Sequence, residues 1–209
     1  MKASLSVLPT TPAAPRATVH PLWLRITHWI NALSVIIMIL SGWRIYNASP
    51  IFPFVFPKEW TLGGWLGGAL QWHFAAMWLL AVNGLAYLFL NLLTGRAQRK
   101  FFPLHPTEVL HDFLQALKGK LQHASLDHYN AMQKLAYLSV IADLVLIVIS
   151  GLAVWKSVQL PLLRDLMGGF DNARIVHFFA MSFLVLFIVV HIVMVALVPR
   201  TLLAMLRGR

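Results

Sequence analysis

Four of the nine histidines lie inside long apolar segments of the chain, where no water is available to solvate an imidazole. These residues are His28, His73, His177 and His191. An ionisable side chain in a bilayer core costs about 3 kcal/mol or more, so such residues are functional candidates by default. The four imidazoles therefore need four partners.

His177 and His191 are 14 residues apart in the last apolar segment. In an α-helix this spacing ends about 40° short of four full turns, so both rings leave the same helix face. A rise of about 1.5 Å per residue separates their levels by about 21 Å, most of a hydrocarbon core about 30 Å thick. One helix face thus offers a ligand near each membrane surface.

The elements that carry these histidines are predicted to be membrane-spanning helices. A helix needs about 20 apolar residues to cross a bilayer core. The chain is 59% hydrophobic and only 11% charged, so four spans account for most of its 209 residues and leave no room for a second domain. We predict an all-α membrane protein in which residues 20–209 form a four-transmembrane-helix bundle, with spans at about 22–46, 70–93, 135–155 and 176–198.

Lysine and arginine are distributed unevenly between the segments that connect the spans. The amino-terminal arm, the middle loop and the carboxyl-terminal tail hold 12 of the 17. Because positively charged flanks stay cytoplasmic, both termini are predicted to be cytoplasmic. The two outer loops hold the other five cations, Arg44, Lys58, Lys156, Arg164 and Arg174.

This topology pairs the histidines by depth. His28 lies about two turns into an outward-running helix, at the inner level. His73 opens the inward-running second helix at the outer level, and the fourth helix places His177 outside and His191 inside. We therefore expect His73 to face His177 and His28 to face His191.

Paired histidines on two different helices, with no carboxylate or thiolate nearby, are what bis-imidazole haem ligation requires. We predict two haem b groups, with His28 and His191 as the iron ligands of the inner haem and His73 and His177 as those of the outer haem. A zinc or di-iron site would need converging ligands, which about 21 Å of helix rise prevents. The chain has no cysteine, which excludes iron–sulfur clusters, c-type haem attachment and disulfides.

Two glycines and two arginines are predicted to contact the haems. Gly42 lies 14 residues after the first ligand and Gly84 lies 11 after the second, so each would leave a notch for the haem that its own helix does not ligate. Arg25 and Arg174 each precede a ligand by three residues and are candidate partners for the propionates. Small residues also serve helix packing and arginines at span ends also snorkel, so both alternatives stay open.

The remaining segments lack catalytic equipment. Residues 1–19 form a predicted flexible cytoplasmic arm with no apolar core long enough for a cleaved signal peptide, so we expect the first span to act as the insertion signal. Residues 107–118 are apolar at helical spacing, which predicts an interfacial amphipathic helix. The net charge of +10 lies mainly on the cytoplasmic face, where anionic lipid attracts it, and nucleic-acid binding is not needed to explain it.

Five segments of the chain resemble bacterial b-type cytochromes of the group loosely called cytochrome b561, or the nickel-iron hydrogenase and thiosulfate reductase cytochrome b subunits. The resemblance covers about residues 20–200. It implies a four-helix, two-haem subunit whose ligands map onto the four histidines above. Hydrogenase-type relatives usually carry a further helix that is absent here, so a hydrogenase partner is disfavoured. The segments are PLWLRITHW (21–29), GGWL (63–66), QWHFAAMW (71–78), HYNAMQKLAY (128–137) and RIVH (174–177).

These features favour an electron-transfer subunit of the bacterial inner membrane over an autonomous enzyme, with no catalytic residue of its own. Its partners would be membrane lipid, an exchangeable quinone or quinol, and a periplasmic oxidoreductase, molybdopterin-containing among the candidates, or a soluble cytochrome. Asp143 in the third span would either relay a proton or hydrogen-bond to a neighbouring serine or amide. Candidate quinone-site residues are Asn31, Tyr129, Asn130 and Gln133.

Two alternatives stay open at this point. A stand-alone superoxide:quinone oxidoreductase on the same scaffold would need a cationic funnel over the outer haem, which the five outer cations could supply. A cofactor-free four-span protein, such as a transporter or an assembly factor, would be colourless. A co-purifying periplasmic protein would favour the electron-transfer subunit, and an optical spectrum would distinguish both haem hypotheses from the cofactor-free protein.

Overall fold

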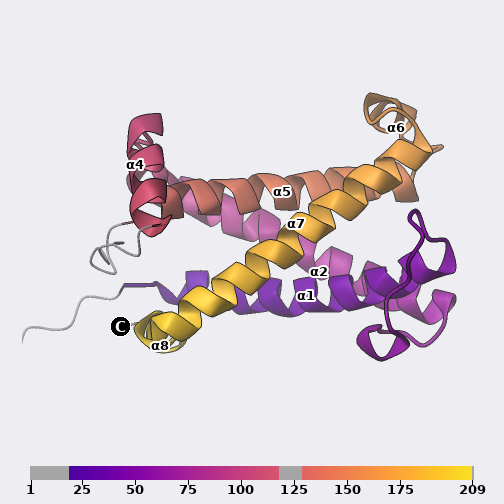
Figure 1. The fold of residues 1–209 in the computed structure, drawn as a ribbon, viewed down its shortest axis with the longest axis horizontal. Helices are drawn as coiled ribbons and strands as arrows, with labels where there is room; N and C mark the ends of the chain where they lie inside the picture. The colour runs from indigo at the N-terminus through magenta and orange to yellow at the C-terminus, as the bar shows by residue number, and fades with distance from the viewer. Residues whose placement is uncertain (1–18, 118–128, 209) are drawn as a thin grey trace, which may run out of the picture.

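The protein is all-helical. The computed structural model describes residues 19–117 and 129–208, and these two stretches contain no β-strand. The predicted arm at residues 1–19 lies outside the described residues except for its last position. In chain order the elements are α1 (Leu22–Ala48), the short 3-10 helix η1 (Lys58–Trp60), α2 (Leu66–Leu93), α3 (Arg96–Phe101), α4 (Pro106–Leu117), α5 (Ala131–Trp155), α6 (Pro161–Leu166), α7 (Phe170–Leu197) and α8 (Pro199–Arg207) (Figure 1).

Four helices, α1, α2, α5 and α7, are long and apolar enough to cross a membrane, which confirms the predicted number of spans. Each has 25 to 28 residues. A helix of that length rises about 40 Å, more than a hydrocarbon core about 30 Å thick, and it satisfies its internal backbone groups without water.

Three of these helices begin four to six residues before the predicted spans. Hydropathy marks the part of a helix that lipid surrounds, whereas the helix itself begins where its first backbone N–H groups find acceptors. In α5 that point is Asn130, whose side chain accepts from the Gln133 N–H while the Gln133 side chain accepts from the Asn130 N–H. This capping box fixes the start of α5 ahead of its apolar stretch.

The two ends of the bundle differ in what they carry. The described chain starts and finishes at one end, where the Val19 N–H donates to the Gly208 carbonyl oxygen at 2.9 Å. We call this the terminal end, and α3, α4 and α8 lie there too (Figure 1). The opposite end holds the connections 49–65 and 156–169 and is called the loop end.

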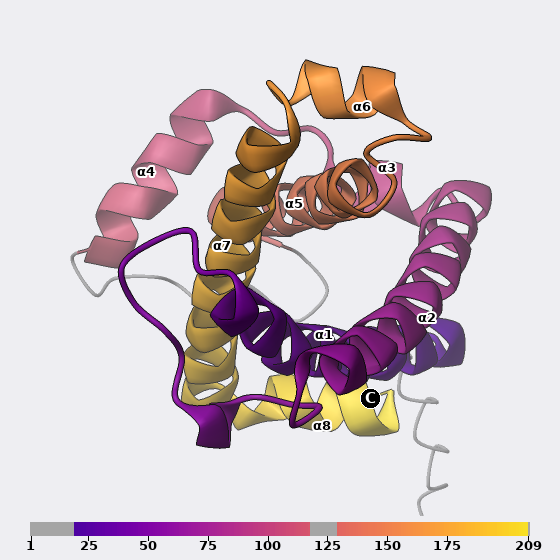
Figure 2. The same cartoon turned by 90° about the vertical axis from the view of Figure 1, so that its right-hand side faces the viewer.

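The spanning helices form two hairpins. α1 packs along α2, and α5 packs along α7, as the view from the loop end shows (Figure 2). Contacts between the two hairpins are made mainly by side chains. A group bound between side chains of α1 or α2 on one side and α7 on the other would therefore join the hairpins.

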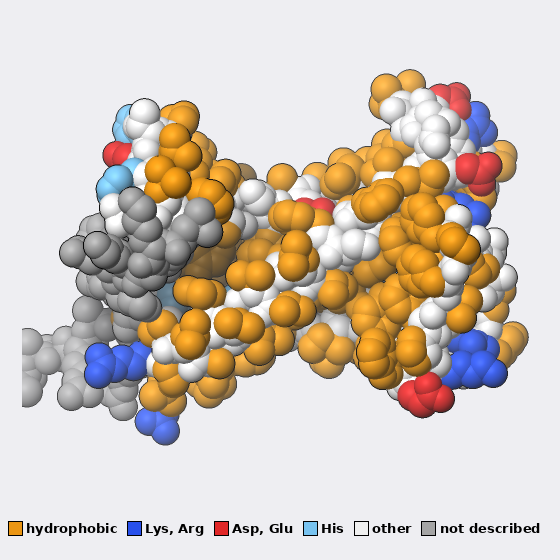
Figure 3. Space-filling view, in the orientation of Figure 1, with side chains coloured by type: hydrophobic (Ala, Val, Ile, Leu, Met, Phe, Trp, Pro, Cys, Tyr) orange, Lys and Arg blue, Asp and Glu red, His pale blue; other side chains and the backbone are white. Residues whose placement is uncertain are grey.

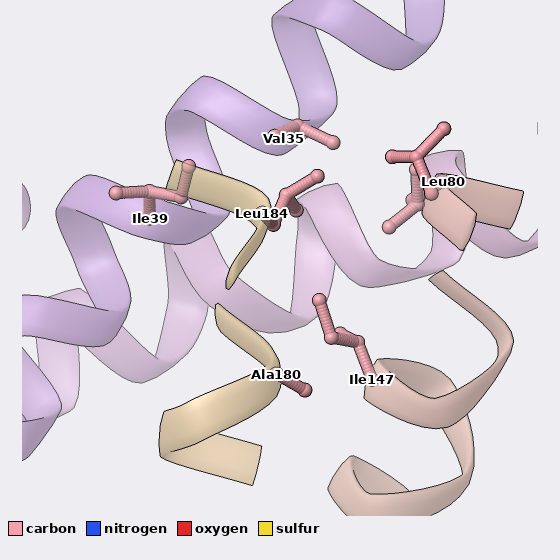
Figure 4. Packing of buried hydrophobic residues seen from close by; sticks show 7 residues of the cluster. Val35, Ile39, Leu80, Ile147, Ala180 and Leu184 are labelled. Atoms are coloured by element: carbon pink, nitrogen blue, oxygen red, sulfur yellow. The ribbon is translucent and has the colours of Figure 1, made fainter. Parts of the chain in front are cut away.

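A layer of aliphatic side chains at mid-depth joins the two hairpins (Figure 4). Each hairpin contributes from both of its helices, and every member is less than a tenth exposed. Because lipid tails are as apolar as these side chains, close packing rather than exclusion of water holds this layer together. Its buried members are Val35, Ile39, Leu80, Val140, Ile147, Ala180 and Leu184.

On the face that Figure 3 shows, apolar side chains cover most of the body of the molecule, and most of the charged side chains lie at its two ends. This is the surface expected of a protein whose middle faces lipid. At the terminal end, α4 forms where residues 107–118 predicted an amphipathic helix. α8 was not predicted.

Arg25 explains how α8 is held. Its guanidinium donates to the carbonyl oxygens of Met205, at 3.1 Å, and of Leu206. These are carbonyls of the last turn of α8, which have no acceptor role within the helix itself. Arg25 thus connects the first turn of α1 to the last turn of α8 by hydrogen bonds.

Aromatic side chains close the loop end. The connection from α1 to α2 folds back so that Phe56 stacks on Trp43, with ring centroids 4.7 Å apart. The ring centroid of Tyr46 lies 5.3 Å from that of Phe54 and 5.1 Å from that of Phe178 on α7. This cluster packs the loop end of α1 against α7.

Asn83 makes a buried polar contact within the first hairpin. Its side-chain amide donates to the Thr27 carbonyl oxygen at 2.8 Å and to the Asn31 side-chain oxygen at 2.6 Å. Asn91, also buried on α2, donates only to the Tyr87 carbonyl of its own helix.

We expect Asn83→Leu to lower the free energy of unfolding of the detergent-solubilised protein by about 1 kcal/mol more than Asn91→Leu does. The reason is that Asn83 bonds across two helices and Asn91 within one. Thermal or denaturant unfolding followed by circular dichroism measures the difference. Equal losses for the two variants would show that the contact does not hold the hairpin together.

Candidate metal centre

The structure brings the four membrane-embedded histidines together as two pairs. His73 of α2 faces His177 of α7 near the loop end, with ring centroids 6.5 Å apart and ring planes at 71°. His28 of α1 faces His191 of α7 near the terminal end, at 6.2 Å and 58°. These are the pairs expected from depth, and each pair takes one member from each hairpin.

Both separations fit a metal ion held between two imidazoles. With metal–nitrogen bonds of about 2 Å, the centroids of two coordinating rings lie about 6 Å apart. All four histidines are only partly buried, which leaves ring atoms accessible to a group bound between the helices. Among the described residues no cluster of three or more His, Cys, Asp or Glu side chains forms a metal site, so each pair stands as a two-ligand site. A planar macrocycle that supplies the other ligands fits this donor set.

Two serines contact the loop-end pair. The hydroxyl oxygen of Ser41 on α1 lies 3.1 Å from Nδ1 of His73, and that of Ser150 on α5 lies 3.0 Å from Nδ1 of His177. Both serines are fully buried. In each case the serine lies on the first helix of a hairpin and the histidine on the second.

A glycine follows each serine and contacts the same ring. A Cβ atom at Gly42 would lie 3.5 Å from Cε1 of His73, and one at Gly151 would lie 3.2 Å from Cε1 of His177. Gly42 thus lies at the level predicted from helix spacing and borders the His73 imidazole, and the notch for a macrocycle edge at Gly42 stays a prediction. A Cβ atom at Gly84 would have no atom within 4 Å, so its backbone borders open space.

The terminal-end pair has aromatic neighbours instead. The His28 ring lies edge-on to Trp29, with ring centroids 5.3 Å apart. The Phe187 ring stacks on His191, with centroids 5.9 Å apart and ring planes at 11°. Neither histidine has a hydrogen-bond partner among the residues that the structure describes. The two pairs therefore differ in what orients their rings.

The two arginines that were candidates for propionate contact are engaged with the protein backbone. Arg25 donates to the last turn of α8, as described above. Arg174 donates to the Ser49 carbonyl oxygen at 2.5 Å and lies 4.0 Å from an Asp171 oxygen. Both guanidinium groups thus donate to carbonyl oxygens at the end of another helix, Arg25 at the end of α8 and Arg174 at the end of α1. Contact with a propionate stays a prediction.

Three of the four candidate quinone-site residues lie together at the start of α5, and the fourth, Asn31, lies on α1. Asn31 bonds to Asn83 within the first hairpin, and Gln133 is part of the α5 capping box. Tyr129 and Asn130 line an open cavity of about 370 Å³ between α4 and the start of α5 at the terminal end. Its other walls are Thr107, Glu108, His111, Asp112, Ala131 and Lys134.

Asp143 lies between two members of the mid-depth layer on α5 and is 8% exposed. Its Oδ2 atom has no hydrogen-bond partner in the described part of the chain. A serine or amide partner for that oxygen, one of the two alternatives taken from the sequence, is therefore not present there. An unpaired polar oxygen at this depth costs about 1–3 kcal/mol.

The cations of the loop end are partly neutralised. Arg164 donates to Asp165 at 2.7 Å, and this hydrogen bond lowers the pKa of the Asp165 carboxyl. Arg174 lies beside Asp171. Two of the five cations that a funnel would use thus have acidic neighbours.

Sequence reasoning missed Ser41, Ser150 and Gly151. The available pattern was the dipeptide Ser-Gly, which occurs near the loop end of both the first and the third span. Each Ser-Gly is followed by a histidine on the next span, 32 residues after Ser41 and 27 after Ser150. A search for repeats of a few residues, rather than of whole segments, would have found it.

Comparison with known proteins agrees with this arrangement. The family model described as prokaryotic cytochrome b561 matches residues 19–208. The chain belongs to the prokaryotic cytochrome b561 family, which confirms the resemblance, and it is a membrane electron-transfer subunit of the kind that carries haem b. A protein of Azospira oryzae named putative protein-methionine-sulfoxide reductase subunit YedZ1 is 65% identical over 190 residues, covering 91% of this chain and 96% of the relative.

We expect Gly151→Ala to weaken haem retention at the loop end more than Gly42→Ala, because the added methyl group would stand 3.2 Å from His177 and 3.5 Å from His73. Gly84→Ala, which meets no atom within 4 Å, is the matched control. Gly84→Leu fills the open space and should disturb only haem at the terminal end. Haem-to-protein ratios of the purified variants provide the measurement, and identical ratios for all four would contradict the expected order.

Proposed function

We propose that this chain is a di-haem b-type cytochrome that transfers electrons across the membrane between the quinone pool and a periplasmic oxidoreductase. The carrying observation is the pair of facing histidines at each end of the bundle, with ring separations that fit a shared iron. His28 and His191 would hold one haem, and His73 and His177 the other. Haem iron supplies a reversible one-electron couple, and two imidazole ligands leave no open position for oxygen.

The distribution of positive charge supports an orientation with the terminal end in the cytoplasm. Most lysines and arginines flank the spans at that end. Positively charged flanks resist translocation, so the terminal-end pair would be the inner site and the loop-end pair the outer one. In a bacterium this corresponds to a multi-pass protein of the inner membrane.

Quinone would exchange electrons and protons at the terminal end. The cavity lined by Tyr129, Asn130 and Lys134 lies there and offers hydrogen-bonding groups beside the start of a spanning helix. Asp143 supports a proton route toward the same end, since its unpaired oxygen is buried at mid-depth. We assign these residues to quinone binding and proton transfer as part of the proposal.

The periplasmic partner is proposed to be a reductase of oxidised methionine in proteins. Support comes from the relative in Azospira oryzae, whose name makes it a subunit of such a reductase. A molybdopterin-containing reductase is the type of partner that the resemblance to cytochrome b subunits implies. Docking would take place at the loop end, where Trp60, Trp65 and Phe54 are exposed.

A stand-alone superoxide:quinone oxidoreductase is the second candidate, and it is less well supported. It needs a strong positive field over the loop-end site to steer an anion. Asp165 and Asp171 lie against Arg164 and Arg174 and weaken that field. The cofactor-free hypothesis is disfavoured because the chain belongs to a cytochrome family.

Replacing one ligand of a pair should remove only the haem of that pair. We expect His28→Ala or His191→Ala to lose the terminal-end haem, and His73→Ala or His177→Ala to lose the loop-end haem, because iron with one axial ligand is poorly held. Haem stoichiometry and reduced-minus-oxidised spectra of the four variants measure this. A crossed pattern, in which His28 and His177 lose the same haem, would show that the pairing is wrong.

The quinone assignment is tested by reduction in detergent. We expect a short-chain quinol to reduce the haem of the purified protein, and a quinone-site inhibitor to block this, because the proposed route brings electrons in from the quinone pool. Reduction by dithionite in the same sample is the control for competent haem. Haem that stays oxidised with every quinol but is reduced by a soluble cytoplasmic donor would overturn the assignment.

A further inference from the structure

We propose that Ser41 and Ser150 are positioning residues that hold His73 and His177 in one tautomer and so lower the midpoint potential of the loop-end haem. This inference rests on the proposed function, since it concerns the ligands of that haem. It adds to the proposed function a reason why the two haems would differ in redox potential.

The tautomer follows from the hydrogen bonds that each serine already makes. The Ser41 hydroxyl donates to the Ile37 carbonyl oxygen at 2.7 Å, and the Ser150 hydroxyl donates to the Leu146 carbonyl oxygen at 2.7 Å. A hydroxyl has one hydrogen, so what each serine offers the ring is a lone pair. Because the contact with the carbonyl is the shorter one and takes the single hydroxyl hydrogen, we assign the hydrogen of the 3.1 and 3.0 Å contacts to Nδ1 of His73 and of His177.

The tautomer in turn determines which nitrogen is free. With the hydrogen on Nδ1, the lone pair of each imidazole lies on Nε2, on the other side of the ring. A metal ligand needs that lone pair, and a hydrogen bond at the second nitrogen fixes both the tautomer and the ring orientation. The serines thus prepare both rings to bind iron through Nε2 before any haem enters.

The same local arrangement occurs twice in the molecule. In each hairpin the serine contacts Nδ1, and the glycine that follows it lies against Cε1 of the same ring. The serine and glycine come from α1 and α5, and the rings come from α2 and α7. Two occurrences in hairpins of otherwise different sequence favour a role in orienting the rings over incidental helix packing.

The terminal-end pair gives an internal comparison. Its rings lie against Trp29 and Phe187, and neither ring bonds to a hydroxyl in the described part of the chain. Hydrogen-bond donation from Nδ1 makes an imidazole a stronger electron donor to its metal, which stabilises the oxidised iron. The serines should therefore lower the potential of the loop-end haem and leave the other haem unaffected.

Ser34 provides a matched control on the same helix. It lies two turns from Ser41, is fully buried, and donates to the Ile30 carbonyl oxygen at 2.8 Å. Among the described residues it has no hydrogen bond to a histidine. Ser34→Ala therefore removes the same hydroxyl and the same intrahelical bond as Ser41→Ala, without altering a ligand.

The test is a redox titration of the purified, haem-loaded full-length variants, followed optically. We expect Ser41→Ala and Ser150→Ala each to raise the midpoint potential of one haem only, and the double variant to raise it further. Transfer of that haem to apomyoglobin should become about ten times faster, the usual scale for loss of such a partner. Ser34→Ala should match the wild type, and Ser41→Thr and Ser150→Thr, which keep a hydroxyl, should restore the wild-type potential.

The outcomes separate this inference from the proposed function. If Ser41→Ala and Ser150→Ala gave the same potentials and transfer rates as Ser34→Ala, the serines would not act on the ligands and the inference would be wrong. If the wild type itself bound no haem or only one, the proposed di-haem function would fail before any serine variant was compared. The unchanged spectrum of the terminal-end haem in each variant shows that the chain has folded.

Discussion

The need to satisfy both nitrogens of an imidazole in lipid governs the arrangement of this protein. In water an unpaired ring nitrogen is solvated, whereas within a bilayer it must find a partner in the protein or in a ligand. At the loop end, serine hydroxyls accept from Nδ1 of His73 and His177, which leaves the lone pair of each ring on Nε2, and the two rings lie opposite one another with centroids 6.5 Å apart. The serines thus select the nitrogen through which each ring would bind the proposed metal.

In the proposed function, cofactor binding helps to hold the two hairpins together. Backbone packing is extensive within each hairpin, while the hairpins meet through the mid-depth aliphatic layer, the loop-end aromatic cluster and the two histidine pairs. One histidine pair lies on each side of the aliphatic layer. In the proposed function, a metal bound by the two rings of a pair joins the two hairpins. Because such binding joins elements that are otherwise held by weak packing, its free energy contributes to folding. Under the proposed function, this would account for the presence on α7 of one histidine at each level.

The parts of this arrangement that depend on one helix at a time could be predicted from the sequence. The shared face and the depth difference of His177 and His191 follow from helical geometry alone, and the four spans follow from hydropathy. Depth along the spans also predicted which histidines face one another, but the other side-chain contacts between helices could not be predicted. Whether Ser41 meets His73, or Arg25 meets the end of α8, depends on how neighbouring helices are rotated and shifted, which spacing within one helix does not determine. Gly42 shows the limit, since its level was predictable but the group lying against it was not.

The difference between the two histidine pairs follows from where each lies in its hairpin. His73 and His177 stand near the connections, opposite the last turns of α1 and α5, where each hairpin partner supplies a serine. His28 and His191 stand at the open ends of the hairpins. There Asn83 of α2 bonds to the Thr27 carbonyl and to Asn31 rather than to an imidazole. Ring orientation at that end rests on stacking with Trp29 and Phe187, which constrains the plane of a ring but not the position of its hydrogen. Two sites with the same donor atoms thus acquire different electronic environments from the topology of the chain.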